Sequence, residues 1–404
     1  MPQIQLSSKH AAAITATLGL LSLFPPLATD MYLSAIGDLA DSMATDHAGA
    51  ELSLSIFFLG LCVGQLLIGP LADGFGRRLP LLAGTVLFLA TSVLLPMMDD
   101  IASFNALRFL QAIGASAGMV VGRAVVKDLY SGQQAAQVMT VLVMLLTVGP
   151  IVSPTFGSLL LQAFGWRSIF VAMAAVSAVA LVLTLLVLPE TLPAPERQPR
   201  PFRDGAASAA RLLGRGSFLS MTLVAGFVQG GMFAFITGSS GVFQGRFGQD
   251  TLSFGLIFAL IAAALVVFGR VNTILLRRHS PARILSRGLP VFVAASAVLV
   301  AMSGTSQMWL FVAPLWIAIG MVGLLSANAM SMAMEVAHDR AGIGSALLGA
   351  IQFAIAFAVS SLVALGGSGS AMPMAMGLLV PSLAASGLFF GSRAMRPTVA
   401  AAGQ

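Results

Sequence analysis

Charged residues are scarce in this sequence. Asp, Glu, Lys and Arg make up 9% of its 404 residues, whereas a soluble domain contains about 25%. Hydrophobic residues make up 57%, and the mean hydropathy is +0.94. These few charged residues cannot give a folded chain of this length a polar surface. We therefore expect an integral membrane protein. Apolar runs of roughly 20 residues predict spanning helices rather than the alternating strands of a barrel.

Reactive and metal-binding side chains are also scarce. The one cysteine, Cys62, excludes an intramolecular disulfide. The four histidines lie at helix ends or in loops without metal-ligand spacing: His10, His47, His279 and His338. No nucleotide-binding loop or nucleophile motif is present. The sequence therefore predicts no enzyme, no metal and no cofactor, and the net charge of +6 is better explained by membrane topology than by nucleic acid.

Apolar stretches recur along the whole chain and predict an all-α polytopic membrane protein with twelve transmembrane helices. The first is too long for the apolar region of a signal peptide, so it is taken as a retained helix. The predicted spans are 11–36, 52–72, 79–98, 101–122, 136–162, 167–188, 217–240, 252–272, 284–304, 308–334, 342–365 and 371–392.

The distribution of basic residues predicts the orientation. With a cytoplasmic N-terminus, all of the 21 Lys and Arg residues except Arg108, Arg167 and Arg246 fall on the inner side. This asymmetry follows the positive-inside rule. It predicts a multi-pass protein of a bacterial inner membrane with both termini cytoplasmic.

A polar segment, 189–216, divides the spans into six and six. It contains five prolines and five arginines, which favour an extended stretch at the cytoplasmic surface. Its part RDGAASAARLLGR leaves a short surface helix and a plain linker both open. We therefore predict two pseudo-symmetric six-helix bundles, 1–188 and 217–404. The Gly and Arg-Arg of GPLADGFGRR (69–78) recur in GRVNTILLRR (269–278), as duplicated halves with a site between them would predict.

The segment GPLADGFGRR resembles the signature loop of the major facilitator superfamily. Gly69, Asp73, Gly76, Arg77 and Arg78 match it, and Gly74 stands where a basic residue is usual. The resemblance implies twelve helices in the fold of that superfamily. It also implies a cytoplasmic latch against the start of helix eleven, near residue 342. A simple positive-inside anchor is the alternative.

In the fourth span, RFLQAIGASAG is similar to the superfamily's proton-coupling motif. Arg108, Gln111, Gly114 and Ala115 match, and Ala112 replaces a usual glycine. An arginine within a span is costly unless it reaches the surface or faces a polar interior. Gln111 lies at i+3 on the same helix face and favours the interior.

In the fifth span, GPIVSPTFGS resembles the motif typical of antiporters in this superfamily. Gly149, Pro150, Pro154 and Gly157 carry the resemblance, with serines at two usual glycines. Small residues allow close helix packing and prolines bend a helix. The resemblance implies antiport, and generic bundle packing is the alternative.

Four further segments narrow the resemblance: LATDMYLSAI, GWRSIF, PETL and AGIGSALLGAIQF. Together they resemble the drug:proton antiporters of the bicyclomycin-resistance (Bcr/CflA) type, although Ser34 replaces a usual proline. The resemblance implies proton-driven export of small amphipathic drugs or metabolites, including antibiotics. An importer or facilitator of the superfamily remains the alternative, and a membrane sensor or channel is a third class.

Asp30 is the single acid that the span assignment places within the membrane. It lies roughly 12 Å below the outer face, and Arg108 lies roughly 10 Å below the same face. We therefore predict that Asp30 and Arg108 couple proton transfer to transport, through direct contact or a bridging water. Protonation of Asp30 from outside would release Arg108 or substrate, and deprotonation toward the cytoplasm would restore the site. A static ion pair is the alternative.

The predicted substrate site adds neighbouring polar and aromatic side chains. Aromatic walls with few polar groups suit amphipathic ligands, and amides within a span need partners. The predicted partners are a small amphipathic substrate, protons and membrane lipids, and we expect a monomer. The predicted substrate-binding residues are Asp30, Tyr32, Arg108, Gln111, Gln229, Phe233, Phe235 and Asn328.

Overall fold

The computed structural model describes residues 8–337, 340–367 and 369–394, and in this part of the chain all regular structure is helical. Twelve helices there are long and apolar enough to cross a membrane, which confirms the predicted number of spans. His338 lies outside the described residues. The helices are α1 (Ser8–Ser22), α2 (Phe24–Asp30), α3 (Ile36–Ser42), α4 (His47–Phe75), α5 (Arg78–Leu94), α6 (Ile101–Leu129), α7 (Gly132–Phe164), α8 (Arg167–Val187), α9 (Pro201–Leu213), α10 (Gly216–Ser240), α11 (Thr251–Leu275), α12 (Pro281–Ala301), α13 (Met308–Val336), α14 (Ala341–Leu365) and α15 (Met372–Ala394).

The first span is broken into pieces. It consists of α1, α2, the 3₁₀ turn η1 (Leu33–Ala35) and α3. Pro25 and Pro26 open α2 and have no N–H, so they cannot continue the hydrogen-bond ladder of α1. Asp30 ends α2 and therefore lies at a break in the helix, where its side chain is buried.

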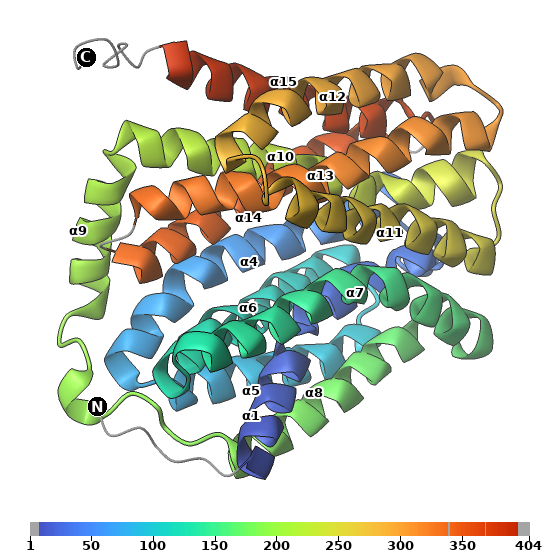
Figure 1. The fold of residues 1–404 in the computed structure, drawn as a ribbon. Helices are drawn as coiled ribbons and strands as arrows, with labels where there is room; N and C mark the ends of the chain where they lie inside the picture. Colours follow the sequence, from blue (N-terminus) through green and yellow to red (C-terminus); the bar gives the residue numbers. More distant parts are fainter. Residues whose placement is uncertain (1–7, 338–339, 368, 395–404) are drawn as a thin grey trace, which may run out of the picture.

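The spanning helices form two bundles, α1–α8 and α10–α15. In Figure 1 the first bundle lies below the second. The bundles meet mainly along two pairs of helices, α4 with α14 and α7 with α11. The residue boundaries of the two halves remain a prediction.

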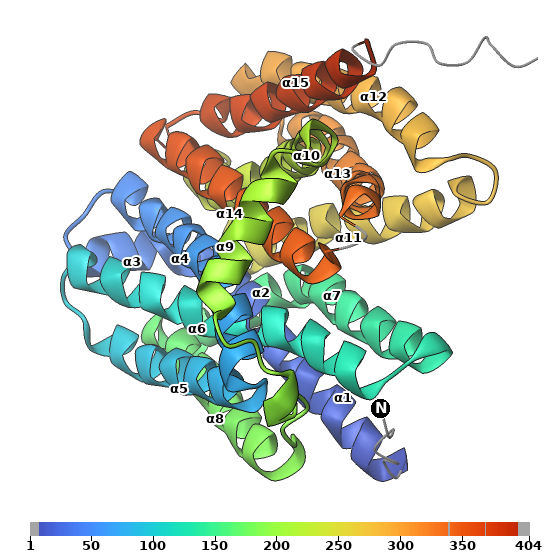
Figure 2. The ribbon, with the colours of Figure 1, turned by 90° about the vertical axis from the view of Figure 1, so that its left-hand side faces the viewer.

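The segment between the bundles forms a surface helix, α9, which settles the choice that the sequence left open. It crosses one end of the molecule between the two bundles (Figure 2), and we call this end the linker face and the opposite end the far face. Leu212 of α9 is fully buried against Phe218, Ala337 and Leu347. A side chain at Gly74 would approach Pro201 of α9 to within 2.6 Å, so the glycine that departs from the family pattern makes room for this helix.

Candidate functional site

A cavity of about 290 Å³ lies between the two bundles. Its wall includes one acid, Asp30, one base, Arg123, and the amides Gln65, Gln229 and Gln352. The remaining wall is largely apolar and includes Phe58, Phe233, Phe353, Met119, Met232 and Met330. An apolar chamber with few polar groups is typical of sites for small amphipathic molecules.

The Asp30 carboxylate lies on the wall of this cavity. Its side chain is almost fully buried, and Oδ1 accepts a hydrogen bond of 2.8 Å from the hydroxyl of Thr29. Across the described residues, Asp30 forms no ion pair. A buried carboxylate without a cation is costly unless it is protonated or bonded by a ligand, so its protonation and its ligand contacts are linked.

Arg108 is fully buried, which excludes snorkelling to the surface. Its Nη2 donates to the carbonyl oxygen of Ala28 at 2.8 Å, and Nη1 donates to Gln111 at 2.6 Å. The guanidinium carbon lies 4.4 Å from the ring centre of Phe57 and 4.8 Å from that of Tyr32. Such contacts stabilise a buried cation by hydrogen bonds and cation–π attraction.

Direct contact between Asp30 and Arg108 was one of the two arrangements expected from the sequence, and it does not occur. Arg108 instead binds the backbone two residues before Asp30. Gln111 also donates to Ser92 at 2.8 Å, so Arg108, Gln111 and Ser92 form the interior polar patch that the i+3 spacing predicted.

The structure brings some of the predicted substrate-binding residues together and separates others. Asp30, Gln229 and Phe233 line the cavity. Tyr32, Arg108, Gln111, Phe235 and Asn328 do not belong to its wall. Their substrate contacts remain a prediction.

The residues outside the wall have other partners within the protein. Asn328 donates to Asn272 at 2.7 Å, and Phe235 stacks on Phe258 with ring centres 4.6 Å apart. The Tyr32 hydroxyl hydrogen-bonds Ser53. These contacts pack the bundles from within rather than facing the cavity.

Two charged residues at the edges of spans were missed as site candidates. Glu51 was assigned to the outer loops, but α4 begins at His47, and the Glu51 side chain is only 2% exposed. Its Oε1 lies 3.2 Å from Nδ1 of His47. The expectation that Asp30 is the single acid within a span is therefore wrong. The cap residue Asp46, whose carboxylate accepts from the Gly49 N–H, was the signal for an earlier helix start.

Arg123 was counted among the cytoplasmic anchors, but it lies within α6 and lines the cavity. A second cavity of about 460 Å³ opens toward the linker face, and Arg123 and Gln65 line both. The two chambers therefore adjoin at these residues.

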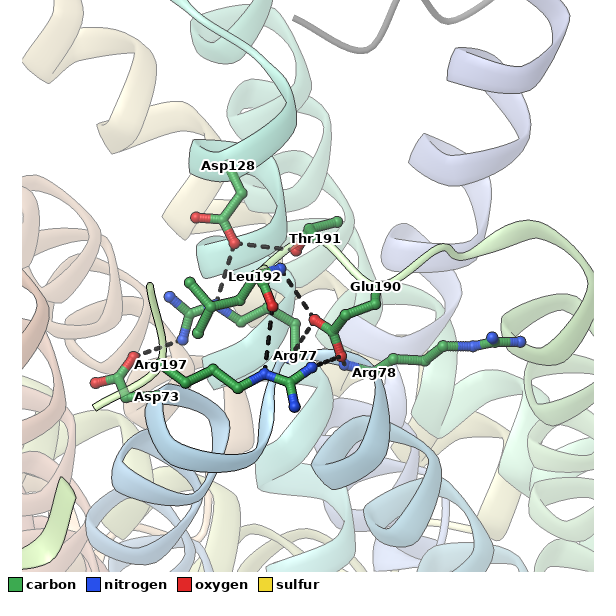
Figure 3. A network of polar contacts seen from close by, with 8 residues as sticks. All are labelled: Asp73, Arg77, Arg78, Asp128, Glu190, Thr191, Leu192 and Arg197. Atoms are coloured by element: carbon green, nitrogen blue, oxygen red, sulfur yellow. Dashed lines mark hydrogen bonds and ion pairs between the residues drawn. The ribbon is translucent and has the colours of Figure 1, made fainter. Parts of the chain in front are cut away.

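The loop between α4 and α5 forms a charged cluster within the first bundle (Figure 3). Arg77 bonds Asp73 at 2.5 Å and Asp128 at 3.1 Å. Thr191 donates to the same oxygen of Asp128 at 3.0 Å. The signature loop is therefore tied to the end of α6 and to the linker.

Glu190 joins this cluster from the linker side. It accepts backbone hydrogen bonds from Arg77 at 2.8 Å, Arg78 at 3.3 Å and Leu192 at 3.0 Å, and lies 3.8 Å from Arg197. Partial burial acts to raise the pKa of Glu190, but the N–H groups of Leu192, Arg77 and Arg78, with Arg197, outweigh it and hold that pKa below its usual range.

Gly76 of the same loop adopts a φ of +92°, which disfavours any side chain. A Cβ at this position would also overlap the Glu190 carboxylate. The signature glycine therefore allows both the chain reversal and the approach of Glu190.

The expected partner of this loop, the start of α14, lies across a gap. The linker-side cavity has Gly69, Asp73 and Arg77 on one wall and Gly342 and Ser345 on another. The two segments face each other across this cavity, and the latch role of the loop remains a prediction.

The fifth-span motif packs tightly from Pro150, on the wall of the inner cavity, toward the far face. A Cβ at Gly157 would overlap the Met31 carbonyl oxygen, and one at Gly149 would lie 3.0 Å from Pro26. The Ser158 hydroxyl donates to the Thr251 carbonyl at 2.9 Å, which joins α7 to α11 in the other bundle.

A second bond links the bundles near the far face. Gln244 follows α10 in the π-helical turn η4 (Gly241–Arg246), and its Nε2 donates to the Ser34 carbonyl at 3.3 Å. The bundles are thus bonded to each other near the far face, while a cavity opens toward the linker face.

Twelve spanning helices in two bundles around a central cavity define a polytopic membrane transporter. The sequence profile of the Major Facilitator Superfamily matches residues 18–361. The chain belongs to this superfamily and is a secondary transporter of small molecules, not an enzyme.

The relatives found by sequence are transporters or resistance proteins. An uncharacterised MFS-type transporter, YdgK of Bacillus subtilis (strain 168), is 31% identical over 391 residues, covering 95% of this chain and 96% of that protein. A bicyclomycin resistance protein homolog of Haemophilus influenzae (strain ATCC 51907 / DSM 11121 / KW20 / Rd) is 28% identical over 359 residues, covering 89% of this chain and 90% of its own length.

Among solved structures, the fold is similar to that of a D-xylose-proton symporter. The TM-score is 0.75 at 14% identity, over 93% of this chain and 97% of that protein. At this identity the likeness confirms the fold of the superfamily, with its two six-helix halves.

Proposed function

We propose that this protein is a proton-coupled antiporter of the Bcr/CflA type that exports small amphipathic drugs or metabolites. The observation that carries the proposal is the placement of Asp30 on the wall of a mainly apolar cavity between the bundles, without an ion-pair partner among the described residues. The resistance protein from Haemophilus influenzae that resembles this chain supports the drug class.

The proposed orientation places the linker face in the cytoplasm of a bacterial inner membrane, with both termini on that side and the chain acting as a monomer. The abundance of arginine in the linker supports this placement. In this orientation the linker-side cavity faces the cytoplasm, and we propose that substrate enters the inner cavity from that side, past Gln65 and Arg123.

Transport then follows from competition at Asp30. From the cytoplasmic side the carboxylate loses its proton, and a bound substrate compensates the buried charge. After the bundles rock to open the far face, a proton from outside neutralises Asp30 and weakens its hold on the substrate. Arg108 keeps the Ala28 segment next to Asp30 in place through its backbone bond.

A growth screen identifies the substrate. An antibiotic-sensitive bacterial host expressing the chain is compared with the same host expressing Asp30→Asn at equal membrane levels. The proposal predicts protection against at least one amphipathic antibiotic by the parent and none by the variant. Equal protection by both contradicts the assignment of Asp30.

An importer or facilitator keeps the same fold but predicts another proton response. In inverted membrane vesicles with a preformed pH gradient, an antiporter dissipates the gradient when substrate is added. A facilitator leaves the gradient unchanged, so this assay separates the two functions.

A further inference from the structure

Two hydrogen-bond donors face the junction of the two cavities. Arg123 from α6 and Gln65 from α4 line both chambers. These two side chains therefore lie where the linker-side cavity meets the cavity that contains Asp30, so their chemistry bears on which molecules fit there.

Arg123 has no carboxylate partner among the described residues. Its Nη1 donates at 3.2 Å to the Ser345 hydroxyl of α14, in the other bundle. Arg77 also lines the linker-side cavity, but its guanidinium forms ion pairs with both Asp73 and Asp128. The guanidinium of Arg123 therefore retains donors that no acidic group satisfies.

Gln65 supplies a second unsatisfied donor. Its side chain is 2% exposed, and Nε2 is buried without a hydrogen-bond partner. A Cβ at Gly349 of α14 would lie 3.1 Å from the Gln65 amide, so glycine at that position leaves the amide room. A buried amide donor without an acceptor is unfavourable, and an incoming acceptor would relieve this.

We propose that Arg123 and Gln65 form a subsite for an anionic or strongly accepting group of the transported molecule, such as a carboxylate. A guanidinium beside an amide matches such a group through charge-assisted hydrogen bonds. Asp30 is the other charged residue on the wall of the inner cavity, so the site has an acidic and a basic pole. The substrate class is then an amphipathic molecule with an acceptor group at one end.

This proposal rests on the proposed function in one respect: it assumes that the transported substrate binds in this cavity. Its test therefore measures binding without a proton gradient. Three probes share one apolar body and differ in charge: 2-naphthoate, neutral 2-naphthamide and 2-naphthylmethylammonium. Their apparent affinities for the purified full-length protein are obtained from ligand-dependent shifts of Tm at constant detergent concentration.

We expect 2-naphthoate to bind the parent and to bind Arg123→Gln at least about tenfold more weakly, because a charge-assisted bond is lost. Gln65→Glu should weaken the binding of 2-naphthoate by a similar factor, because the two carboxylates repel each other. Its effect on the binding of 2-naphthamide should be smaller. Asp30→Asn should leave 2-naphthoate binding unchanged or stronger and weaken the ammonium probe. Arg287→Gln, which removes an exposed charge on α12 outside the walls of both cavities, is the matched control and should change little.

Absence of a 2-naphthoate shift in the parent overturns the proposal, whatever the other probes do. Equal 2-naphthoate affinity in the parent and Arg123→Gln also overturns it. If Arg123→Gln does not fold, Arg123→Lys and Gln65→Glu provide the same comparison. Loss of proton coupling in a separate assay, with these binding differences intact, would refute antiport and leave the subsite standing.

Discussion

Arg108 holds the backbone of the first span and not its carboxylate: Nη2 donates to the Ala28 carbonyl at 2.8 Å, two residues before Asp30. The base fixes the geometry of the broken helix, while the acid faces the cavity. The two residues therefore have separable effects.

Substitution of each residue should separate stability from coupling. Arg108→Ala leaves the Ala28 carbonyl and Gln111 without their partner and removes the cation from its aromatic rings, so we expect a loss of about 3 kcal/mol or more in the free energy of unfolding. Asp30→Asn keeps an acceptor for Thr29 and should change that free energy by less than about 1 kcal/mol. Denaturant unfolding in detergent measures both, and equal losses would contradict this division of roles.

Gly157→Ala should disturb the packing near the far face. A Cβ there overlaps the Met31 carbonyl oxygen, so α7 and the first span must separate. With Ser34→Cys as a reporter in a Cys62→Ser background, we expect several-fold faster labelling by an impermeant maleimide added outside. Gly269→Ala is the matched control, since a Cβ at Gly269 would meet nothing within 4 Å. Unchanged labelling in Gly157→Ala would refute a role of this glycine in closing the far face.

The bonds around Glu190 should weaken in acid. Its folded-state pKa lies below the ordinary value of 4.5, so its stabilising contribution is complete above about pH 4.5 and is lost as the pH falls through the lower folded value. Hydrogen exchange of the 76–79 and 190–198 segments, corrected for intrinsic rates, should show protection at pH 7 that declines below pH 4. Glu190→Gln should lack much of this protection at pH 7. A protection pattern identical in parent and variant at every pH would contradict the assignment.

Hydropathy was sufficient for the twelve spans, because each span must individually satisfy the membrane. The break of the first span at Pro25 and Pro26 can also be inferred from the sequence, since proline lacks a backbone N–H wherever it occurs. Arg108 could be placed in the interior because Gln111 follows at the spacing of one helical turn.

The direction in which individual side chains point could not be predicted from the sequence. Phe235 and Asn328 were expected at the cavity, but the rotation of α10 and α13 turns them toward Phe258 and Asn272. That rotation depends on contacts between helices far apart in sequence. Arg123 was missed because α6 extends beyond its apolar core, so a residue assigned to the surface faces the cavity.

Proton release measured with Asp30 present and absent tests the central claim most directly. The purified parent and Asp30→Asn are reconstituted in liposomes with a pH-sensitive dye, and a substrate identified by the growth screen is added. Our account predicts substrate-dependent proton movement by the parent and none by Asp30→Asn, although the variant still folds. Equal substrate-dependent proton movement by both proteins would show that Asp30 is not the proton carrier.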